Sequence, residues 1–149
     1  MPRSVNGLSR GGDLVALLEQ SRVHKSSLIR VTGPSGLSAL LWLCRHGYDQ
    51  VGYLRTGQGC PHEQPDALIV AHTCDEACLR RLLSEGPHVR EGGVLIFQSH
   101  LPAGAIDAGP DPIHACLDRY GYAVERCLHG SRRELHVARR LTQTWRKAA

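Results

Sequence analysis

Short apolar runs and longer segments of periodic apolar residues take turns along this chain. Continuous aliphatic runs are typical of parallel strands covered on both faces, whereas apolar residues three or four positions apart indicate one buried face of a helix. The pattern predicts strands at 28–32, 48–55, 67–71 and 94–97, with helices at 37–44, 76–83 and 112–120. Strands that alternate with helices indicate an α/β fold built on a parallel sheet.

The pattern changes near the end of the chain. Residues 123–128 and 134–139 are both strand-like, and only a short turn around His129-Gly130-Ser131 separates them. Two strands joined so closely run antiparallel, because a parallel pair needs a crossover connection of roughly a dozen residues or more. We therefore predict a three-layer Rossmann-like domain whose mostly parallel sheet ends in a C-terminal antiparallel hairpin.

Capping residues refine the boundaries of the helices. Asp13 is a good N-cap for a first helix. Thr73 and Glu76 have the spacing of a capping box at the start of the helix predicted at 76–83. The most apolar segment, 37–44, is predicted to be a buried helix. These boundaries divide the chain into a leader (1–12), a single domain (13–141) and a basic tail (142–149).

Composition limits the class of protein. The chain has 149 residues, of which 42% are hydrophobic and 21% charged, and this balance fits one ordinary globular domain. Its densest apolar stretch is far too short to span a bilayer, and the first residues lack the apolar core of a secretory signal. We therefore expect a cytoplasmic protein whose six cysteines are reduced thiols.

Positive charge gathers near the end of the chain. The formal net charge is +4, and it comes mostly from arginines. A cluster of basic side chains can bind the phosphates of a nucleic acid; the members here are Arg132, Arg133, Arg139, Arg140, Arg146 and Lys147. Solvated charge around the last strand is the simpler interpretation, so nucleic acid is kept as an alternative partner.

Three segments give the chain a likeness to a known family: Ile29–Arg55, Asp66–Phe97 and Gly121–Arg140. In this order they resemble the class I S-adenosylmethionine-dependent methyltransferases, whose last strand is also antiparallel. In that family a glycine-rich turn after the first strand lets the backbone approach the cofactor, since a side chain would clash there. The resemblance implies cofactor contacts from Thr32, Gly33, Pro34, Ser35, Gly36 and Ala71.

The chain also departs from that family. Arg30 replaces the acid of the first-strand motif, and Leu54-Arg55-Thr56 stand where a carboxylate would bind the ribose hydroxyls. Only about ten residues join the second strand to the third, too few for a crossover helix and another strand. We therefore expect one outer strand to be missing, leaving residues 50–55 as a sheet edge that a second copy of the chain could cover in a homodimer.

A second family shares the glycine turn. Gly33, Gly36 and Ala39 also resemble the TGxxGxxA turn of short-chain dehydrogenases, which places a pyrophosphate on a helix N-terminus. Arg55 would then suit the 2′-phosphate of NADP. The chain has no Tyr-x-x-x-Lys sequence, however, and the dehydrogenases have no counterpart of the closing hairpin.

Histidines and cysteines are the candidates for chemistry. His72 and His100 follow two aliphatic runs, where open α/β sheets bind their ligands, and an imidazole can act there as a general base near neutral pH. Cys78 belongs to the apolar stripe of the third helix. We assign no metal site, because the spacing matches no known zinc motif in the group Cys60, His62, His72, Cys74 and Cys78.

The sequence therefore leaves more than one function open. The first is an S-adenosylmethionine-dependent methyltransferase with an unidentified small-molecule or protein substrate, in which His72 and His100 lie near the methyl group. The second is a non-catalytic relative that keeps the sheet as a binding domain or scaffold. An NAD(P)-binding domain is the remaining alternative.

Overall fold

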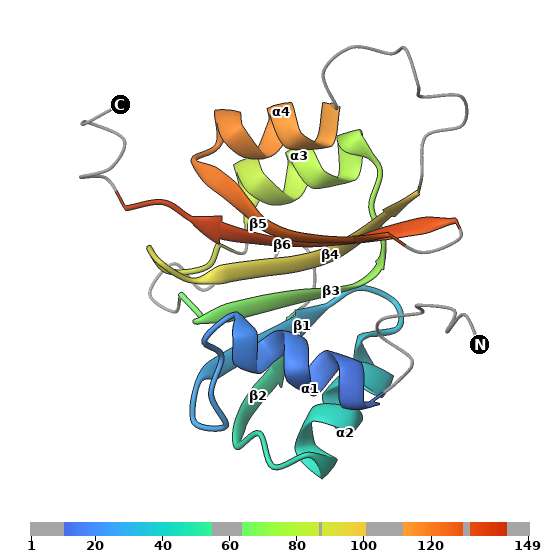
Figure 1. Ribbon diagram of the computed structural model, residues 1–149, viewed down its shortest axis with the longest axis vertical. Helices are drawn as coiled ribbons and strands as arrows, with labels where there is room; N and C mark the ends of the chain where they lie inside the picture. Colours follow the sequence, from blue (N-terminus) through green and yellow to red (C-terminus); the bar gives the residue numbers. More distant parts are fainter. Residues whose placement is uncertain (1–10, 55–63, 87, 101–111, 130–131, 143–149) are drawn as a thin grey trace.

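A computed structural model describes residues 11–54, 64–86, 88–100, 112–129 and 132–142 (Figure 1). These residues form a three-layer α/β structure in which a sheet separates two pairs of helices, α1 with α2 and α3 with α4. The predicted fold class is confirmed, since every predicted strand and helix is present. None of the described helices has the length and hydrophobicity of a membrane-spanning segment.

The sheet has six strands in the order β2-β1-β3-β4-β6-β5. The first four in this order run parallel, and β6 pairs antiparallel with both β4 and β5. The closing hairpin is thus confirmed. The strands are β1 (Leu28–Thr32), β2 (Gln50–Tyr53), β3 (Ala67–Thr73), β4 (Val94–His100), β5 (Tyr122–His129) and β6 (Arg133–Arg140).

The helices are α1 (Gly11–Gln20), α2 (Gly36–Arg45), α3 (Glu76–Glu85) and α4 (Pro112–Arg119). Two predicted caps are wrong. The first helix begins at Gly11, so Asp13 lies inside it. Asp75, not Thr73, caps α3, because its carboxylate accepts a hydrogen bond from the Cys78 N–H at 2.7 Å while Thr73 still belongs to β3.

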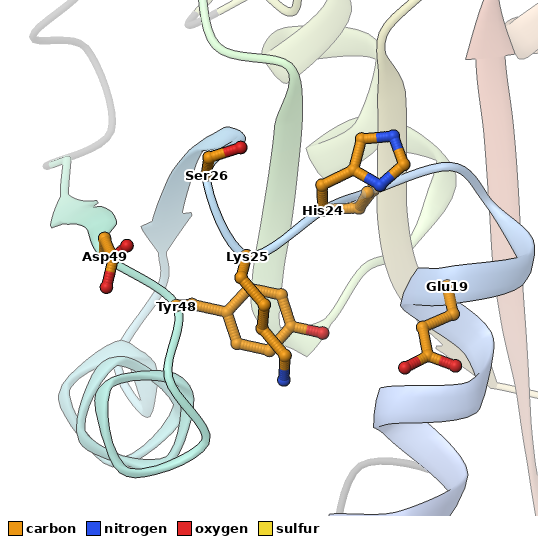
Figure 2. A pocket seen from close by; sticks show the side chains of 7 residues that line it. Glu19, His24, Lys25, Ser26, Tyr48 and Asp49 are labelled. Carbon is orange, nitrogen blue, oxygen red and sulfur yellow. The ribbon is translucent and has the colours of Figure 1, made fainter.

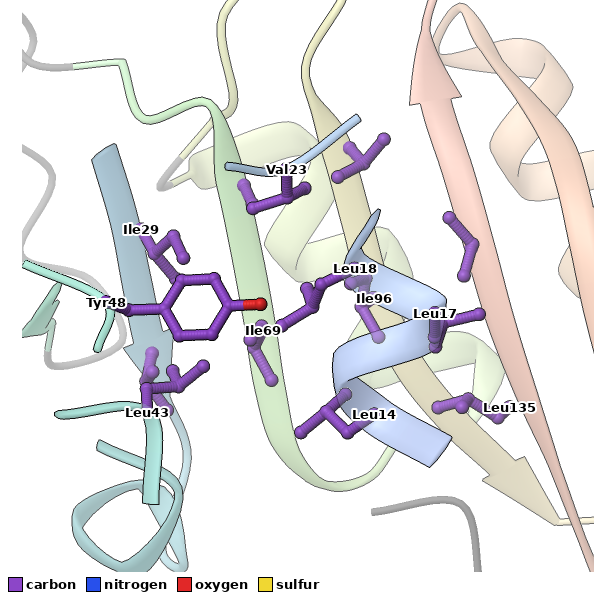
Figure 3. Packing of buried hydrophobic residues seen from close by; sticks show 14 residues of the cluster. Leu14, Leu17, Leu18, Val23, Ile29, Leu43, Tyr48, Ile69, Ile96 and Leu135 are labelled. Carbon is purple, nitrogen blue, oxygen red and sulfur yellow. The ribbon is translucent and has the colours of Figure 1, made fainter. Parts of the chain in front are cut away.

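Each face of the sheet has its own apolar core. Figure 3 shows Leu14, Leu17 and Leu18 of α1 packed over Ile69 and Ile96 of the central strands. The second core lies between the sheet and the helix pair α3 and α4. Because both faces are covered, the central strands carry the continuous aliphatic runs that predicted them.

Helix α2 is less buried than its sequence predicts. Only Gly36 and Leu43 of this helix are buried, whereas Leu37 is 64% and Leu41 is 51% exposed. The two exposed leucines are four positions apart, so they lie on the same side of the helix. The prediction of a buried helix is therefore wrong for the outer side of α2, which presents apolar surface.

Strand β2 forms one edge of the sheet, as expected for a fold without the family's outer strand. Among the described residues, β2 pairs with β1 alone. Its outer row of backbone N–H and C=O groups thus has no strand beside it, and such a row is suited to pairing with another chain.

The arginines of β6 take part in the fold. Arg139 forms an ion pair with Glu125 and donates hydrogen bonds to the carbonyls of Gly92 and Ser21 at 2.6 and 2.7 Å. Arg140 donates to the carbonyl of Val89 at 2.6 Å. These two side chains tie the hairpin to neighbouring loops, which weakens the case for a phosphate-binding cluster.

Candidate functional site

The carboxyl ends of the parallel strands bring the predicted site residues to one edge of the sheet. In open α/β sheets this edge is where ligands bind. The turn Gly33–Gly36 follows β1, and His72 and His100 lie near the ends of the neighbouring strands β3 and β4. Both histidines are still within their strands rather than beyond them, which corrects their predicted positions.

The turn after β1 depends on glycine. Gly33 has a φ of +103°, in the region that residues with side chains rarely adopt. Its carbonyl accepts a hydrogen bond from the Gly36 N–H at 3.0 Å, which closes the turn at the start of α2. Thr32 is buried, while Pro34 and Ser35 are exposed, and the Ser35 side chain makes no capping hydrogen bond.

Tyr53, at the end of β2, covers this turn. A Cβ at position 36 would lie closer than 3.0 Å to the Tyr53 ring, so the ring rests directly on Gly36. The Tyr53 hydroxyl also donates a hydrogen bond to the Gly33 carbonyl at 3.0 Å. The sequence did not identify Tyr53 as a site residue, although Tyr53 directly precedes Leu54-Arg55-Thr56, the segment that replaces the ribose-binding carboxylate.

His72 covers the other glycine of the turn. A Cβ at position 33 would lie closer than 3.0 Å to Nδ1 of His72 and 3.3 Å from the backbone of Ala71. Nδ1 is buried and has no hydrogen-bond partner among the described residues. Gly33 is thus required by a close approach as well as by its backbone conformation, and the imidazole is held against the turn.

The opposite side of the His72 ring faces two thiols. Nε2 lies 3.4 Å from Sγ of Cys78 and 4.0 Å from Sγ of Cys74, and the two sulfurs are 3.7 Å apart. Cys74 is fully buried, and both this burial and the neighbouring Cys78 raise its pKa. Contrary to the sequence interpretation, Cys78 contacts this cluster instead of serving only as core packing.

The remaining predicted site residues do not join this group. His100 is exposed at the end of β4, opposite Arg133 of β6, and Arg55 lies outside the described residues. Arg30 turns toward β2, where its guanidinium lies 3.1 Å from the position of a Cβ on Gly52.

A buried serine and histidine lie deeper in the sheet. Oγ of Ser99 is 2.7 Å from Nε2 of His136, whose ring stacks on Phe97 with 4.8 Å between centroids. His136 is fully buried beneath α4, and the nearby Cys127 thiol donates to Glu134 at 3.1 Å. Ser99 and His136 are thus buried polar partners of each other, whereas Cys127 and Glu134 are half-buried.

A surface hollow of about 410 Å³ lies at the other end of the sheet (Figure 2). Lys25 and Tyr48 line it, and the Lys25 Nζ lies 4.1 Å from the centre of the Tyr48 ring while donating to the His46 carbonyl at 2.6 Å. Burial and the nearby Glu19 raise the pKa of Tyr48. The residues that line the hollow come just before β1 and β2 in the sequence. The hollow therefore lies at the amino ends of these strands, away from the carboxyl ends where ligands bind.

Comparison with known proteins gives information on the fold. No protein-family model matches the chain, and no curated protein matches it in sequence. The ribosomal protein L11 methylase of Lactobacillus delbrueckii subsp. bulgaricus is similar in structure, with a TM-score of 0.56 and 12% identity over 89% of this chain and 79% of that protein. A protein assigned as an RNA methyltransferase from Pyrococcus horikoshii gives a TM-score of 0.58 and 10% identity over 89% of this chain and 83% of its own.

A third similar structure is a complex with a ligand. It is P. horikoshii TYW2 in complex with MeSAdo, with a TM-score of 0.50 and 12% identity over 89% of this chain and 54% of that protein. Identities this low establish the fold alone. The fold of this chain is that of the class I S-adenosylmethionine-dependent methyltransferases, and the resemblance seen in the sequence is confirmed at that level.

S-adenosylmethionine is the cofactor that this fold implies, and it would need free space over the backbone of the Gly33–Gly36 turn. Both glycines that would allow its approach are covered, Gly36 by Tyr53 and Gly33 by His72. The end of β2 offers Tyr53 and Leu54 in place of a carboxylate for the ribose. Among the described residues, those at the turn and at the end of β2 therefore do not fit the cofactor in this arrangement.

Proposed function

We propose that this protein uses a methyltransferase fold as a binding domain and does not transfer methyl groups. One observation carries the proposal: the side chains of Tyr53 and His72 occupy the space over the two glycines of the turn. In a cofactor-dependent relative that space would have to stay free, because a glycine turn is useful to a ligand only while its backbone is exposed. Here the chain fills the space itself.

The electrostatics of the same region support the proposal. Hydroxyl groups of a ribose are commonly held by a carboxylate after a strand of the sheet. At this position β2 ends in Tyr53 and Leu54, and the Leu54 N–H donates to the Val31 carbonyl at 2.8 Å. Arg30 of β1 adds a positive charge where the family carries an acid.

The partner that we propose is a second copy of this chain. No strand of the described chain pairs with the outer edge of β2, and α2, which packs beside it, exposes Leu37 and Leu41. In a two-fold arrangement the same edge pairs with itself, so one contact would satisfy the backbone of both β2 strands. The exposed leucines would add apolar area beside the paired strands.

A second candidate function is a methyltransferase whose site opens when Tyr53 moves. The observation that favours it is the exposure of Tyr53, which is 43% accessible and therefore has solvent into which it can turn. The Gly33–Gly36 turn would then serve S-adenosylmethionine, the cofactor that the methyltransferase fold implies. His72 and His100 would remain the candidates for an acid or base.

Calorimetric titration separates these functions. The wild-type chain is titrated with S-adenosylhomocysteine, S-adenosylmethionine and NADPH, and we expect three flat titrations. Binding of either adenosyl compound would contradict the proposal and support the methyltransferase, whereas binding of NADPH would favour a dinucleotide-binding domain.

Two variants make this experiment sharper. Tyr53→Ala removes the ring that covers Gly36, and Tyr53→Phe keeps the ring but removes the hydrogen bond to Gly33. We expect Tyr53→Phe to give flat titrations like the wild type. Uptake of S-adenosylhomocysteine by Tyr53→Ala alone would identify this ring as the block, and equal uptake by Tyr53→Phe would contradict that explanation.

A further inference from the structure

Three side chains at the end of β3 and the start of α3, those of His72, Cys74 and Cys78, form a cluster whose chemistry does not depend on cofactor binding. Nε2 of His72 and the sulfurs of Cys74 and Cys78 all lie within 4.8 Å of one another. We propose that these three atoms hold a zinc ion, with the fourth coordination position left to water or to another soft ligand.

The spacing of the atoms is that of a zinc tetrahedron. With Zn–S bonds of about 2.3 Å and a Zn–N bond of about 2.0–2.1 Å, tetrahedral geometry places the sulfurs about 3.8 Å apart and each sulfur about 3.5 Å from the nitrogen. The sulfurs here are 3.7 Å apart, and the two sulfur–nitrogen distances are 3.4 and 4.0 Å. An ion could therefore enter with small side-chain movements.

The backbone holds all three ligands in place before any metal arrives. The Cys74 N–H donates a hydrogen bond to the Gln98 carbonyl of β4 at 2.7 Å. The Cys78 N–H, in the first turn of α3, donates a hydrogen bond to the Asp75 carboxylate. Gly33 supports the third ligand, because the His72 ring rests against it with Nε2 directed to the sulfurs. Such preorganisation lowers the cost of binding.

The chemistry of the donors selects the metal. Thiolates and imidazole are ligands that suit zinc, whereas magnesium and calcium take oxygen ligands. A disulfide is the competing use of two neighbouring cysteines, but its sulfurs would be about 2.05 Å apart. The separation of 3.7 Å seen here leaves both sulfurs as free thiols.

Binding balances in charge and in protons. Cys74 and Cys78 each release a proton to solvent and His72 binds as the neutral imidazole, so two thiolates neutralise the divalent ion. Three protein ligands leave one tetrahedral position, the arrangement found in zinc sites that bind water or substrate. His72 and Cys78 are partly exposed, so we place this open position on their side of the cluster.

Metal titration of the full-length chain tests the site. The reduced protein is freed of metal with a chelator and titrated with Zn²⁺ by calorimetry and with Co²⁺ by absorption spectroscopy. We expect one equivalent to bind, with thiolate-to-cobalt charge transfer and the intense visible bands of tetrahedral cobalt. Absence of saturable binding would overturn the proposal, as would a Cys74–Cys78 disulfide in protein isolated without air.

Variants assign the ligands. Cys78→Ser and His72→Gln change partly exposed positions, and we expect each to weaken zinc binding by about 100-fold or more, since even neighbours of metal ligands are worth about 10–100-fold. Cys44→Ser removes an exposed thiol from α2 and serves as the matched control. If Cys78→Ser binds zinc as tightly as Cys44→Ser, the assignment is wrong.

Two readouts guard against unfolding and against confusion with the proposed function. Far-ultraviolet circular dichroism shows whether each variant keeps its helices, and loss of charge-transfer intensity in a folded Cys78→Ser reports a lost thiolate ligand. The zinc site does not rest on the absence of methyl transfer. A chain that binds both cobalt and S-adenosylhomocysteine would refute the proposed function and leave the metal site intact.

Discussion

At the scale of single residues, Gly33 links the backbone to the cluster at the end of β3. Its positive φ closes the turn after β1, and its missing side chain leaves room for the His72 ring. The same ring then meets two thiols on its other side. One glycine thereby determines both that the turn is covered and that an imidazole nitrogen faces the sulfurs.

Two features make alanine unfavourable at position 33: the positive φ of the backbone and the close approach of the His72 ring. Comparing Gly33→Ala with Gly47→Ala separates the cost of the second feature from that of the first. Both glycines have positive φ, but a Cβ at position 47 would meet only Lys25, at 4.0 Å. We expect Gly47→Ala to lower the free energy of unfolding by about 1 kcal/mol, and Gly33→Ala to cost about 1–3 kcal/mol more because the His72 ring must shift.

Urea denaturation measures both costs. A second comparison in a His72→Ala background checks the cause, since the additional cost of Gly33→Ala should then largely disappear. An additional cost of unchanged size in that background would show that the His72 ring is not what makes alanine unfavourable at position 33.

Asp66 provides a pH-dependent contribution to stability. Burial alone would raise its pKa, but the hydrogen bond from the Leu28 N–H at 2.8 Å and the ion pair with Arg90 outweigh burial and lower it. A carboxyl whose pKa is lower in the folded state stabilises the protein above its unfolded pKa of about 3.9. This contribution is lost as the pH falls through the folded pKa.

Asp66→Asn should therefore lower the free energy of unfolding by about 1–2 kcal/mol at pH 7. The difference from wild type should begin to shrink as the pH falls below about 4 and should vanish below the folded pKa of Asp66, where both chains carry a neutral side chain. Urea denaturation at several pH values measures it, and Glu91→Gln, at an exposed position, is the control. A difference that stays constant down to low pH would mean that the charge of Asp66 contributes nothing.

At the scale of elements, the junction of β3 and α3 places the cluster. Strand β3 continues to Thr73, and α3 begins only at Glu76, so Cys74 and the cap Asp75 form the connection. Because the strand runs longer and the cap comes later than predicted, His72 remains in the sheet while Cys78 lies on the first turn of the helix.

Two substitutions distinguish the observed cap from the predicted one. Asp75→Ala should lower the free energy of unfolding by about 0.5–2 kcal/mol, because the Cys78 N–H loses its acceptor. Thr73→Val keeps the branched shape that suits a strand and should change stability by less than about 0.5 kcal/mol. Thermal denaturation compares the two variants. A larger loss of stability in Thr73→Val than in Asp75→Ala would show that Thr73, as predicted from the sequence, is the cap.

At the scale of the whole molecule, a core of buried residues lies on each face of the sheet, but the β2 edge is less covered. Within the ranges that the structure describes, β2 pairs with one strand, and α2 exposes two leucines beside it. A monomer would leave this surface in water, which is the reason for the proposed contact with a second copy.

Sedimentation at increasing protein concentration tests that contact. We expect a dimer, and we expect Leu41→Lys to weaken association by about tenfold or more, because a charge would enter the apolar surface. Ser84→Lys adds the same charge at an exposed position of α3 and should leave association unchanged. A wild-type chain that stays monomeric at high concentration, or equal effects of both variants, would contradict the contact.

The sequence by itself determined the order of strands and helices and the antiparallel end of the sheet. These features follow from local patterns: aliphatic runs need two covered faces, and a short turn permits only an antiparallel pair. The loss of the outer strand was also visible, since the length of a connection limits what it can contain.

Tertiary structure alone decided what happens at the carboxyl edge. Tyr53 is distant in sequence from Gly36, and no local pattern shows that its ring covers that glycine. Likewise, His72, Cys74 and Cys78 have no recognisable motif spacing, because a strand, its cap and the next helix bring them together. Side chains from separate elements meet only when the sheet is assembled, so their distances and their chemistry belong to the folded chain.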